Sequence, residues 1–185
     1  MKIALDVLGG DSAPDVNIQG AIDYLNLYDD NAANLILVGN QKEIESSLKH
    51  HNYNKSKIEI LHTTEVITMN EKSSRIFRDK PDSSMVKAIE LVKNQDANAI
   101  LSAGNTGALL ISSLFIIGKI SGVLRPAFAP FIPTRNGGFI LCDAGANAES
   151  KPSHLIQFSL MASAYIEHLN NIYKPKVGLL NIGKE

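Results

Sequence analysis

Residues 3–14 have the sequence IALDVLGGDSAP, and the rest of the chain can be interpreted outward from this unit. Residues 3–8 are apolar except for Asp6, which is typical of a buried strand. The glycines and polar residues that follow indicate a turn, and Pro14 favours the first turn of a helix. A strand, a glycine-rich turn and a helix in this order predict an α/β protein.

The same order recurs along the chain. We expect further strands over residues 35–39, 58–61, 97–101 and 177–183, helices over 18–28, 41–50, 83–92, 107–118 and 155–169, a long connection over 62–82, and a hairpin formed by 128–133 and 139–142. Strands that alternate with helices predict a mostly parallel sheet with helices on both faces. We expect residues 1–185 to form a single α/β domain that is incomplete at its C-terminus, because the pattern calls for another helix after the last strand.

Composition excludes several classes of protein. The 185 residues are 44% hydrophobic and 20% charged, which is typical of a folded globular chain. The net charge of -1 lacks the basic excess of a nucleic-acid binder, so no nucleic acid is expected as a partner. The single cysteine, Cys142, excludes an internal disulfide and a multi-cysteine zinc site, and no metal is expected.

The sequence also gives expectations about the cellular location of the protein and its cofactors. The N-terminus has too short an apolar run before Asp6 for a secretory signal. The longest apolar stretch, residues 107–118, is too short to span a bilayer. We therefore expect a cytoplasmic protein. The glycine motifs of dinucleotide-binding and P-loop proteins are absent, and no cofactor is expected.

Candidate binding residues lie where the predicted strands end. Ligands of open α/β sheets bind beyond the carboxyl ends of the strands. The richest of these positions is residues 102–107, where Gly104 and Gly107 permit close backbone approach and Ser102, Asn105 and Thr106 supply polar groups. Free N–H groups at the following helix start favour an anion such as phosphate. The alternative is an ordinary strand–helix turn in which Asn105 or Thr106 is the cap.

A basic segment precedes the helix predicted from Ser83. Lys80 lies there with Arg75 and Arg78, and a cation beside a helix start suits a bound anion. A solvated charged loop explains the same residues equally well.

Several other polar residues have two interpretations each. Asp143 and Glu149 are either an acid–base pair or turn residues. His154 is either a neutral base near a helix start or a capping histidine. Asp6 is either a structural hub or part of the site, since a buried carboxylate must find donors. Cys142 is expected to be a small buried side chain.

Seven segments in order resemble the PlsX family, the acyl-acyl-carrier-protein:phosphate acyltransferases of bacterial phospholipid synthesis. They are LDVLGGDSAP (5–14), ILVGN (36–40), RDKPDSSM (78–85), SAGNTGAL (102–109), GVLRPAFAPFIPT (122–134), DAGANAESKPSHLIQFSLMAS (143–163) and PKVGLLNIG (175–183). The resemblance implies a Rossmann-like three-layer fold, similar to phosphotransacetylases and to isocitrate and isopropylmalate dehydrogenases. Family chains continue well past residue 185, which agrees with an incomplete domain.

The resemblance also implies a reaction. Inorganic phosphate attacks the thioester of a long-chain acyl-acyl carrier protein and gives acyl phosphate, which a membrane glycerol-3-phosphate acyltransferase then uses. It implies a homodimer and, at most, peripheral contact with the membrane. Alternatives are a short-chain phosphotransacetylase, a dehydrogenase on the related fold, and a non-catalytic fragment or binding module.

Each candidate residue takes a role in this hypothesis. Phosphate would bind the 102–107 loop (Ser102, Gly104, Asn105, Thr106 and Gly107) with Lys80 and Ser83. Asn105 or Thr106 would donate to phosphate or to the tetrahedral oxyanion. The strand-exit cleft would be lined by Gly10, Asp11, Asp143, Asn147 and Asn181. His154 would carry a proton to the leaving thiol.

Overall fold

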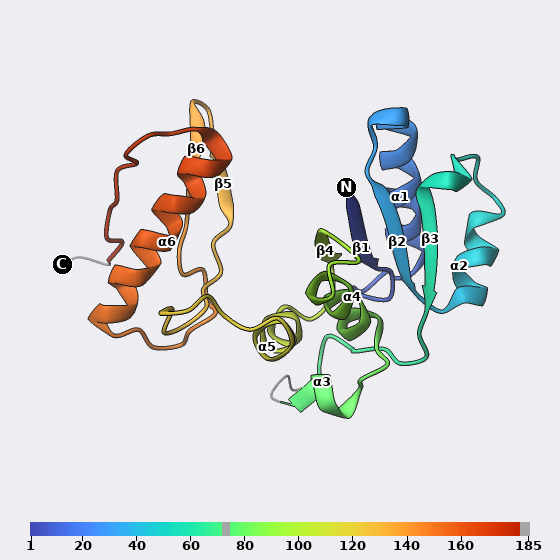
Figure 1. Ribbon diagram of the computed structural model, residues 1–185, viewed down its shortest axis with the longest axis horizontal. Helices are drawn as coiled ribbons and strands as arrows, with labels where there is room; N and C mark the ends of the chain where they lie inside the picture. The colour runs from blue at the N-terminus through green and yellow to red at the C-terminus, as the bar shows by residue number, and fades with distance from the viewer. Residues whose placement is uncertain (72–74, 182–185) are drawn as a thin grey trace. The chain divides into compact units, whose positions relative to one another are not determined.

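The fold is described from a computed structural model that covers residues 1–71 and 75–181. The chain divides into two compact units, Met1–Gly118 and Lys119–Glu185 (Figure 1). Each unit is described by itself, and the single domain expected over residues 1–185 stays a prediction.

A four-stranded parallel sheet organises the first unit. Its strands are β1 (Lys2–Asp6), β2 (Asn34–Gly39), β3 (Ile58–His62) and β4 (Ala99–Ser102), in the order β3-β2-β1-β4. The helices are α1 (Asp15–Tyr28), α2 (Gln41–Leu48), α3 (Ile76–Asp79), α4 (Ser84–Lys93) and α5 (Thr106–Ile116), with short 3-10 turns at Asp29–Asn31 and Lys55–Lys57. The predicted α/β class with a parallel sheet is confirmed.

Alternate side chains of each strand point to opposite faces of the sheet, and each face packs against a layer of helices. On one face, Leu35 and Leu37 of β2 pack with α1 and α2 through residues such as Ile22 and Ile44. On the other face, Ile36 and Val38 pack against α4. Successive strand residues point to opposite faces, so a strand with both sets buried needs cover on both sides. Helices on both faces of the sheet are therefore confirmed.

A third apolar cluster joins α3, α4 and α5. Ile76, Met85, Ile89 and Ala108 are buried in it, and the rings of Phe77 and Phe115 stack with centroids 4.7 Å apart. The predicted 62–82 connection thus contains one short helix, α3. This packing ties the connection to the two helices that begin beside the strand ends.

The second unit contains a hairpin and a long helix. Strands β5 (Phe131–Thr134) and β6 (Gly137–Ile140) pair antiparallel, with Thr134 opposite Gly137. Gly137 has φ of +127°, which favours glycine after the two-residue loop. Helix α6 runs Pro152–Asn170, so it begins three residues before the predicted range 155–169, and its first residue is a proline. The hairpin prediction is confirmed, with both strands shifted by a few residues.

The strand predicted over 177–183 is wrong for the part that is described. Residues 177–181 adopt no strand, and residues 182 and 183 lie outside the described residues. An apolar run becomes a strand only where a neighbouring strand pairs its backbone groups. None of the described strands pairs with this run.

Core packing of β2 gives the first prediction. Leu37 of β2 has no exposed surface and packs in the cluster that β1 and β2 form with α1 and α2. Leu37→Ala should lower the free energy of unfolding by about 2–5 kcal/mol, because it leaves a cavity in a packed layer. Urea titration would measure the change. Leu27→Ala, at a side chain 75% exposed, is the control and should change it by less than about 0.5 kcal/mol. Equal losses in both variants would contradict the packing described.

Candidate functional site

Parallel strands bring several loop starts to one edge of the sheet. In the register, Asp6 at the end of β1 lies beside Val38 of β2 and Ser102 of β4. Gly39 at the end of β2 lies beside His62 of β3. The carboxyl ends of the strands therefore adjoin, as the position of a ligand site in an open α/β sheet requires.

Asp6 is a structural hub at this edge. Its carboxylate is 1% exposed and accepts hydrogen bonds from the Ser84 hydroxyl at 2.5 Å and the Ser102 hydroxyl at 2.7 Å. It also accepts from the N–H of Leu8 at 3.3 Å. A buried carboxylate is stable only with such donors. Asp6 thus ties the end of β1 to the end of β4 and to the start of α4.

Both hydrogen bonds of the Ser102 hydroxyl hold the shape of the 102–107 loop. Its hydroxyl proton goes to Asp6, and its oxygen accepts the N–H of Gly104 at 3.1 Å. Neither Ser102 nor the N–H of Gly104 is therefore available to an anion in this arrangement. Two of the expected phosphate donors are instead used to hold the loop.

Glycines let the two strand-exit loops touch. A Cβ on Gly9 would lie 2.6 Å from Asp6 Oδ2 and 2.8 Å from the backbone N of Gly104. Gly10 has φ of +107°, and a Cβ there would lie 3.2 Å from the carbonyl oxygen of Ala103. These positions tolerate no side chain, which explains the paired glycines. Asp11 lies in the exposed turn that follows.

Asn105 is the N-cap of α5. Its Oδ1 accepts the N–H of Ala108 at 3.0 Å. Its Nδ2 donates to the carbonyl oxygens of Thr68 at 3.3 Å, Met69 at 3.1 Å and Glu71 at 3.0 Å. The capping alternative left open by the sequence is therefore present. The side chain also fastens residues 68–71 to the start of the helix.

The first turn of α5 supplies free donors. The N–H groups of Thr106 and Gly107 belong to this turn and have no hydrogen-bond acceptor among residues 1–71 and 75–181. They carry the positive end of the helix dipole. Of the 102–107 loop, these two backbone groups fit an anion best.

Lys80 and Ser83 precede α4. The Lys80 ammonium donates to the carbonyl oxygen of Val66 at 2.6 Å and forms an ion pair with Glu71. Ser83 is fully buried and its hydroxyl donates back to the carbonyl oxygen of Lys80 at 2.8 Å. Ser83 is the N-cap residue of α4, but its side chain makes no capping bond there. Glu71 is a partner of Lys80 that the sequence did not reveal.

In the second unit, Asp143 organises the loop after β6. Its carboxylate accepts from the N–H groups of Phe128 at 2.8 Å, Ala146 at 3.1 Å and Asn147 at 2.8 Å, and from Asn147 Nδ2 at 3.0 Å. Burial opposes its ionisation, but these hydrogen bonds, led by the Asn147 side chain, outweigh it and lower the pKa of Asp143. Asp143 is thus a charged acceptor in this structure. Asn147 Nδ2 also donates to the Pro126 carbonyl at 2.9 Å.

The remaining candidates of this unit have different settings. His154 is 8% exposed, and its Nδ1 accepts the N–H of Lys151 at 3.2 Å in a capping box. Asn181 is exposed. Burial raises the pKa of the Cys142 thiol, and the charge of Asp143 raises it further. Such a thiol is a poor nucleophile.

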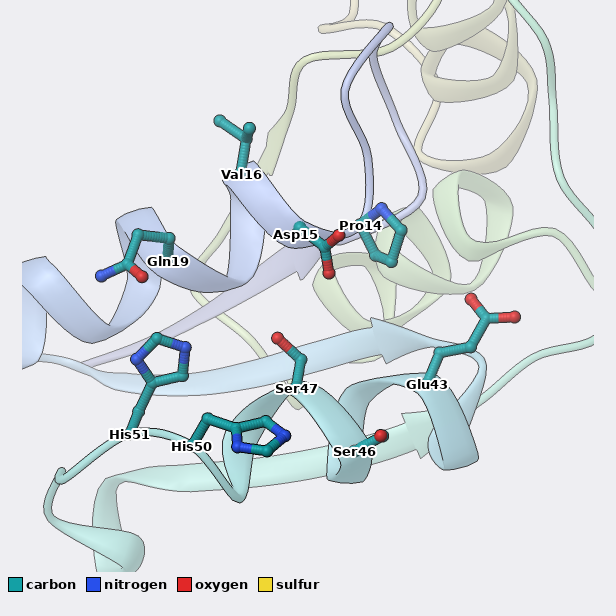
Figure 2. Close-up of a pocket in the computed structure, with 9 residues that line it drawn as sticks. All are labelled: Pro14, Asp15, Val16, Gln19, Glu43, Ser46, Ser47, His50 and His51. Atoms are coloured by element: carbon teal, nitrogen blue, oxygen red, sulfur yellow. The ribbon is translucent and has the colours of Figure 1, made fainter.

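A separate hollow of about 700 Å³ lies between α1 and α2 (Figure 2). Pro14 and Asp15 at the start of α1 line it, and His50 and His51 lie beyond the end of α2. None of the candidate residues named from the sequence lines it. Within the described residues, no group of three or more His, Cys, Asp or Glu is placed to hold a metal ion. No described helix is long and apolar enough to cross a membrane.

The fold and the site define the class: an α/β protein whose loops meet at the carboxyl edge of a parallel sheet, with a helix start suited to an anion. Comparison with known proteins identifies the family of this chain. The model of the family described as "Fatty acid synthesis protein" matches residues 1–185, and the chain belongs to this family.

Curated relatives carry the name phosphate acyltransferase. The protein of Clostridium novyi (strain NT) is 44% identical over 185 residues, which cover all of this chain and 55% of the relative. That of Halothermothrix orenii is 44% identical with the same coverage, and that of Alkaliphilus oremlandii is 48% identical with 54% of the relative covered. The PlsX resemblance is confirmed. The chain spans about 55% of the length of the relatives it matches.

The hub at Asp6 gives a stability prediction. Asp6→Ala should lower the free energy of unfolding by about 2–3 kcal/mol, because the buried hydroxyl of Ser84 and that of Ser102 lose their acceptor. Chemical denaturation would measure it. Asp11→Ala, in the exposed turn, should change stability by less than about 0.5 kcal/mol. An Asp6 variant as stable as wild type would show that Asp6 does not hold these loops.

Asp143 gives a prediction about pH. Its folded pKa is lowered, so its contribution is complete above the unfolded value of about 3.9 and is lost as the pH falls through the folded value. Asp143→Asn should therefore cost roughly 1–3 kcal/mol at pH 7, and less as the pH falls below about 4. Urea unfolding from pH 7 to pH 3 would test this. Glu149→Gln, exposed in the same loop, should show no such trend, and a deficit of Asp143→Asn that does not vary with pH would refute the assignment.

Proposed function

We propose that the whole protein transfers a long-chain acyl group from acyl-acyl carrier protein to inorganic phosphate and releases acyl phosphate for phospholipid synthesis. The observation that carries this proposal is the family membership over all 185 residues, with relatives named phosphate acyltransferase at 44–48% identity. The N–H groups at the start of α5 that have no acceptor in the described part of the chain support an anionic substrate.

The reaction depends more on the positioning of phosphate against the thioester than on a strong base. A phosphate oxygen attacks the thioester carbonyl carbon, a C–O bond forms, and the C–S bond then breaks. The carrier thiolate leaves and takes up a proton. The protein must hold phosphate in line with the carbonyl and stabilise the tetrahedral oxyanion with fixed donors.

Residues of the first unit are assigned to the phosphate. The N–H groups of Thr106 and Gly107 would donate to phosphate oxygens, and Lys80 would supply the positive charge. Gly10, Asp11, Ser83, Ser102 and Gly104 would shape the surrounding wall. Asn105 would act on the site through the α5 cap and the 68–71 segment that its side chain holds.

Residues of the second unit are assigned to the leaving group and to substrate binding. Because Nδ1 of His154 accepts a backbone N–H, Nε2 is the atom that would carry the proton to the thiolate. Asp143 would hold Asn147 in place through their paired hydrogen bonds. Asn147 and Asn181 would contact the substrate.

The wider setting follows from the product. Acyl phosphate is reactive toward water, so direct delivery to a membrane glycerol-3-phosphate acyltransferase would preserve it. We propose a cytoplasmic homodimer that touches the membrane only peripherally. No bound cofactor takes part in this scheme, since phosphate and the thioester supply all the reacting atoms.

The function is tested by release of free carrier thiol from palmitoyl-acyl carrier protein, with and without phosphate, with hydroxylamine to trap acyl phosphate. Phosphate-dependent release with trapped hydroxamate would establish the reaction. Equal turnover with acetyl-coenzyme A would establish a short-chain phosphotransacetylase instead. Carrier binding without turnover would favour a binding module.

Lys80 gives the mutational prediction. Lys80→Ala should lower kcat/KM for phosphate by about 10- to 100-fold, the range for loss of one hydrogen bond to a charged group. Steady-state kinetics with varied phosphate would measure it. Lys87→Ala is the matched control, because Lys87 also pairs with a glutamate, Glu90, on the same part of the chain. If both variants kept wild-type kinetics, Lys80 would have no part in phosphate binding.

A further inference from the structure

Residues 63–82 connect β3 to α4, and the described part of this connection is fastened at several points. Near its ends, the N–H and hydroxyl of Thr64 donate to Asp82 Oδ2 at 2.8 and 2.6 Å. At its middle, Asn105 Nδ2 donates to the carbonyl oxygens of Thr68, Met69 and Glu71. The backbone of Glu71 is therefore held against the first turn of α5.

The side chain of Glu71 points to Lys80. Glu71 Oε1 pairs with the Lys80 ammonium, and Oε2 accepts the N–H of Thr68 at 3.4 Å. Their side chains are 29% (Lys80) and 30% (Glu71) exposed. The other two ion pairs in the described residues, Lys2–Glu59 and Lys87–Glu90, are more exposed. Water therefore screens the Lys80–Glu71 pair least.

This pairing conflicts with an anion on Lys80. An ammonium has three N–H donors, and two of those of Lys80 go to Val66 and Glu71. A phosphate at the third would meet a cation already neutralised, with a carboxylate at hydrogen-bonding distance from the same nitrogen. Like charges this close repel, so each anion weakens the binding of the other to the ammonium.

Resting on the function proposed above, we propose that Glu71 is an internal carboxylate that competes with phosphate for Lys80 and sets the affinity of the site for phosphate. Phosphate binding displaces the Glu71 carboxylate from the ammonium. The backbone of Glu71 stays in place, because Asn105 holds its carbonyl oxygen and not its side chain. The competitor is thereby kept next to the site at a fixed position.

The test is a calorimetric titration of inorganic phosphate into the full-length protein without acyl donor. Glu71→Gln keeps the size of the side chain and one acceptor oxygen, and removes the negative charge by replacing the other oxygen with an NH2 group. We expect it to bind phosphate roughly two- to fivefold more tightly, the range for loss of one partly screened charge pair. Glu90→Gln removes the charge from the Lys87 pair and should leave the affinity unchanged.

A double-mutant cycle identifies Lys80 as the residue through which Glu71 acts. In a Lys80→Gln background, Glu71→Gln should no longer raise phosphate affinity, because no ammonium remains to compete for. Melting temperatures of all variants would show that each is folded. Unchanged or weaker phosphate binding by folded Glu71→Gln would overturn the proposal, as would the same gain in the Lys80→Gln background.

The titration is independent of the acyl-transfer assay. A protein that makes no acyl phosphate but binds phosphate more tightly after Glu71→Gln would refute the proposed reaction and uphold the competition. If the wild-type protein makes acyl phosphate and Glu71→Gln binds phosphate with wild-type affinity, the proposed reaction is upheld and the competition is refuted. Absence of phosphate binding by both wild type and Glu71→Gln would overturn the competition.

Discussion

The buried carboxylate of Asp6 is the interaction on which the edge of the sheet depends. It lies at the end of β1, and its oxygens accept the hydroxyls of Ser84, which begins α4, and of Ser102, which ends β4. A buried charge without donors is costly, so these groups must converge for the fold to be stable. Their convergence fixes where α4 and the 102–107 loop begin. Gly9 then allows the two loops to approach without a side chain between them.

That constraint separates groups that hold the loop from groups that remain for a ligand. Ser102 and the N–H of Gly104 hydrogen-bond to each other within the loop. Asn105 caps α5 and also hydrogen-bonds to the backbone of residues 68–71. The N–H groups of Thr106 and Gly107 have no acceptor in the described structure. The arrangement thus presents backbone donors of a helix start, with polar side chains behind them as support. This suits a tetrahedral anion, which is recognised by several fixed donors.

In each unit, a charged side chain named as a candidate has partners within its own unit. Lys80 is paired with Glu71, and Asp143 in the second unit is charged because four hydrogen bonds hold it so. In the first case a cation suited to phosphate already has a carboxylate partner. In the second an acidic residue suited to proton transfer is engaged as an acceptor. Lys80 and Asp143 therefore both have structural partners. Their roles in the proposed reaction depend on whether those hydrogen bonds and the ion pair can be exchanged for contacts with substrate.

The sequence alone determined the α/β class, the order of the elements, the hairpin and the family, because period-two and helical patterns and glycine motifs are local properties of the chain. It located the strand-exit loop at 102–107 and Lys80 before the start of α4. It could not assign partners: the hydrogen bond from Asn105 to Glu71 spans 34 residues, and the bond from Ser102 to Asp6 spans 96. It also predicted a strand at 177–183, of which residues 177–181 form none. Pairing of strands and saturation of polar groups depend on distant neighbours, so only the tertiary structure decided which groups hold the loops and which have no partner among the described residues.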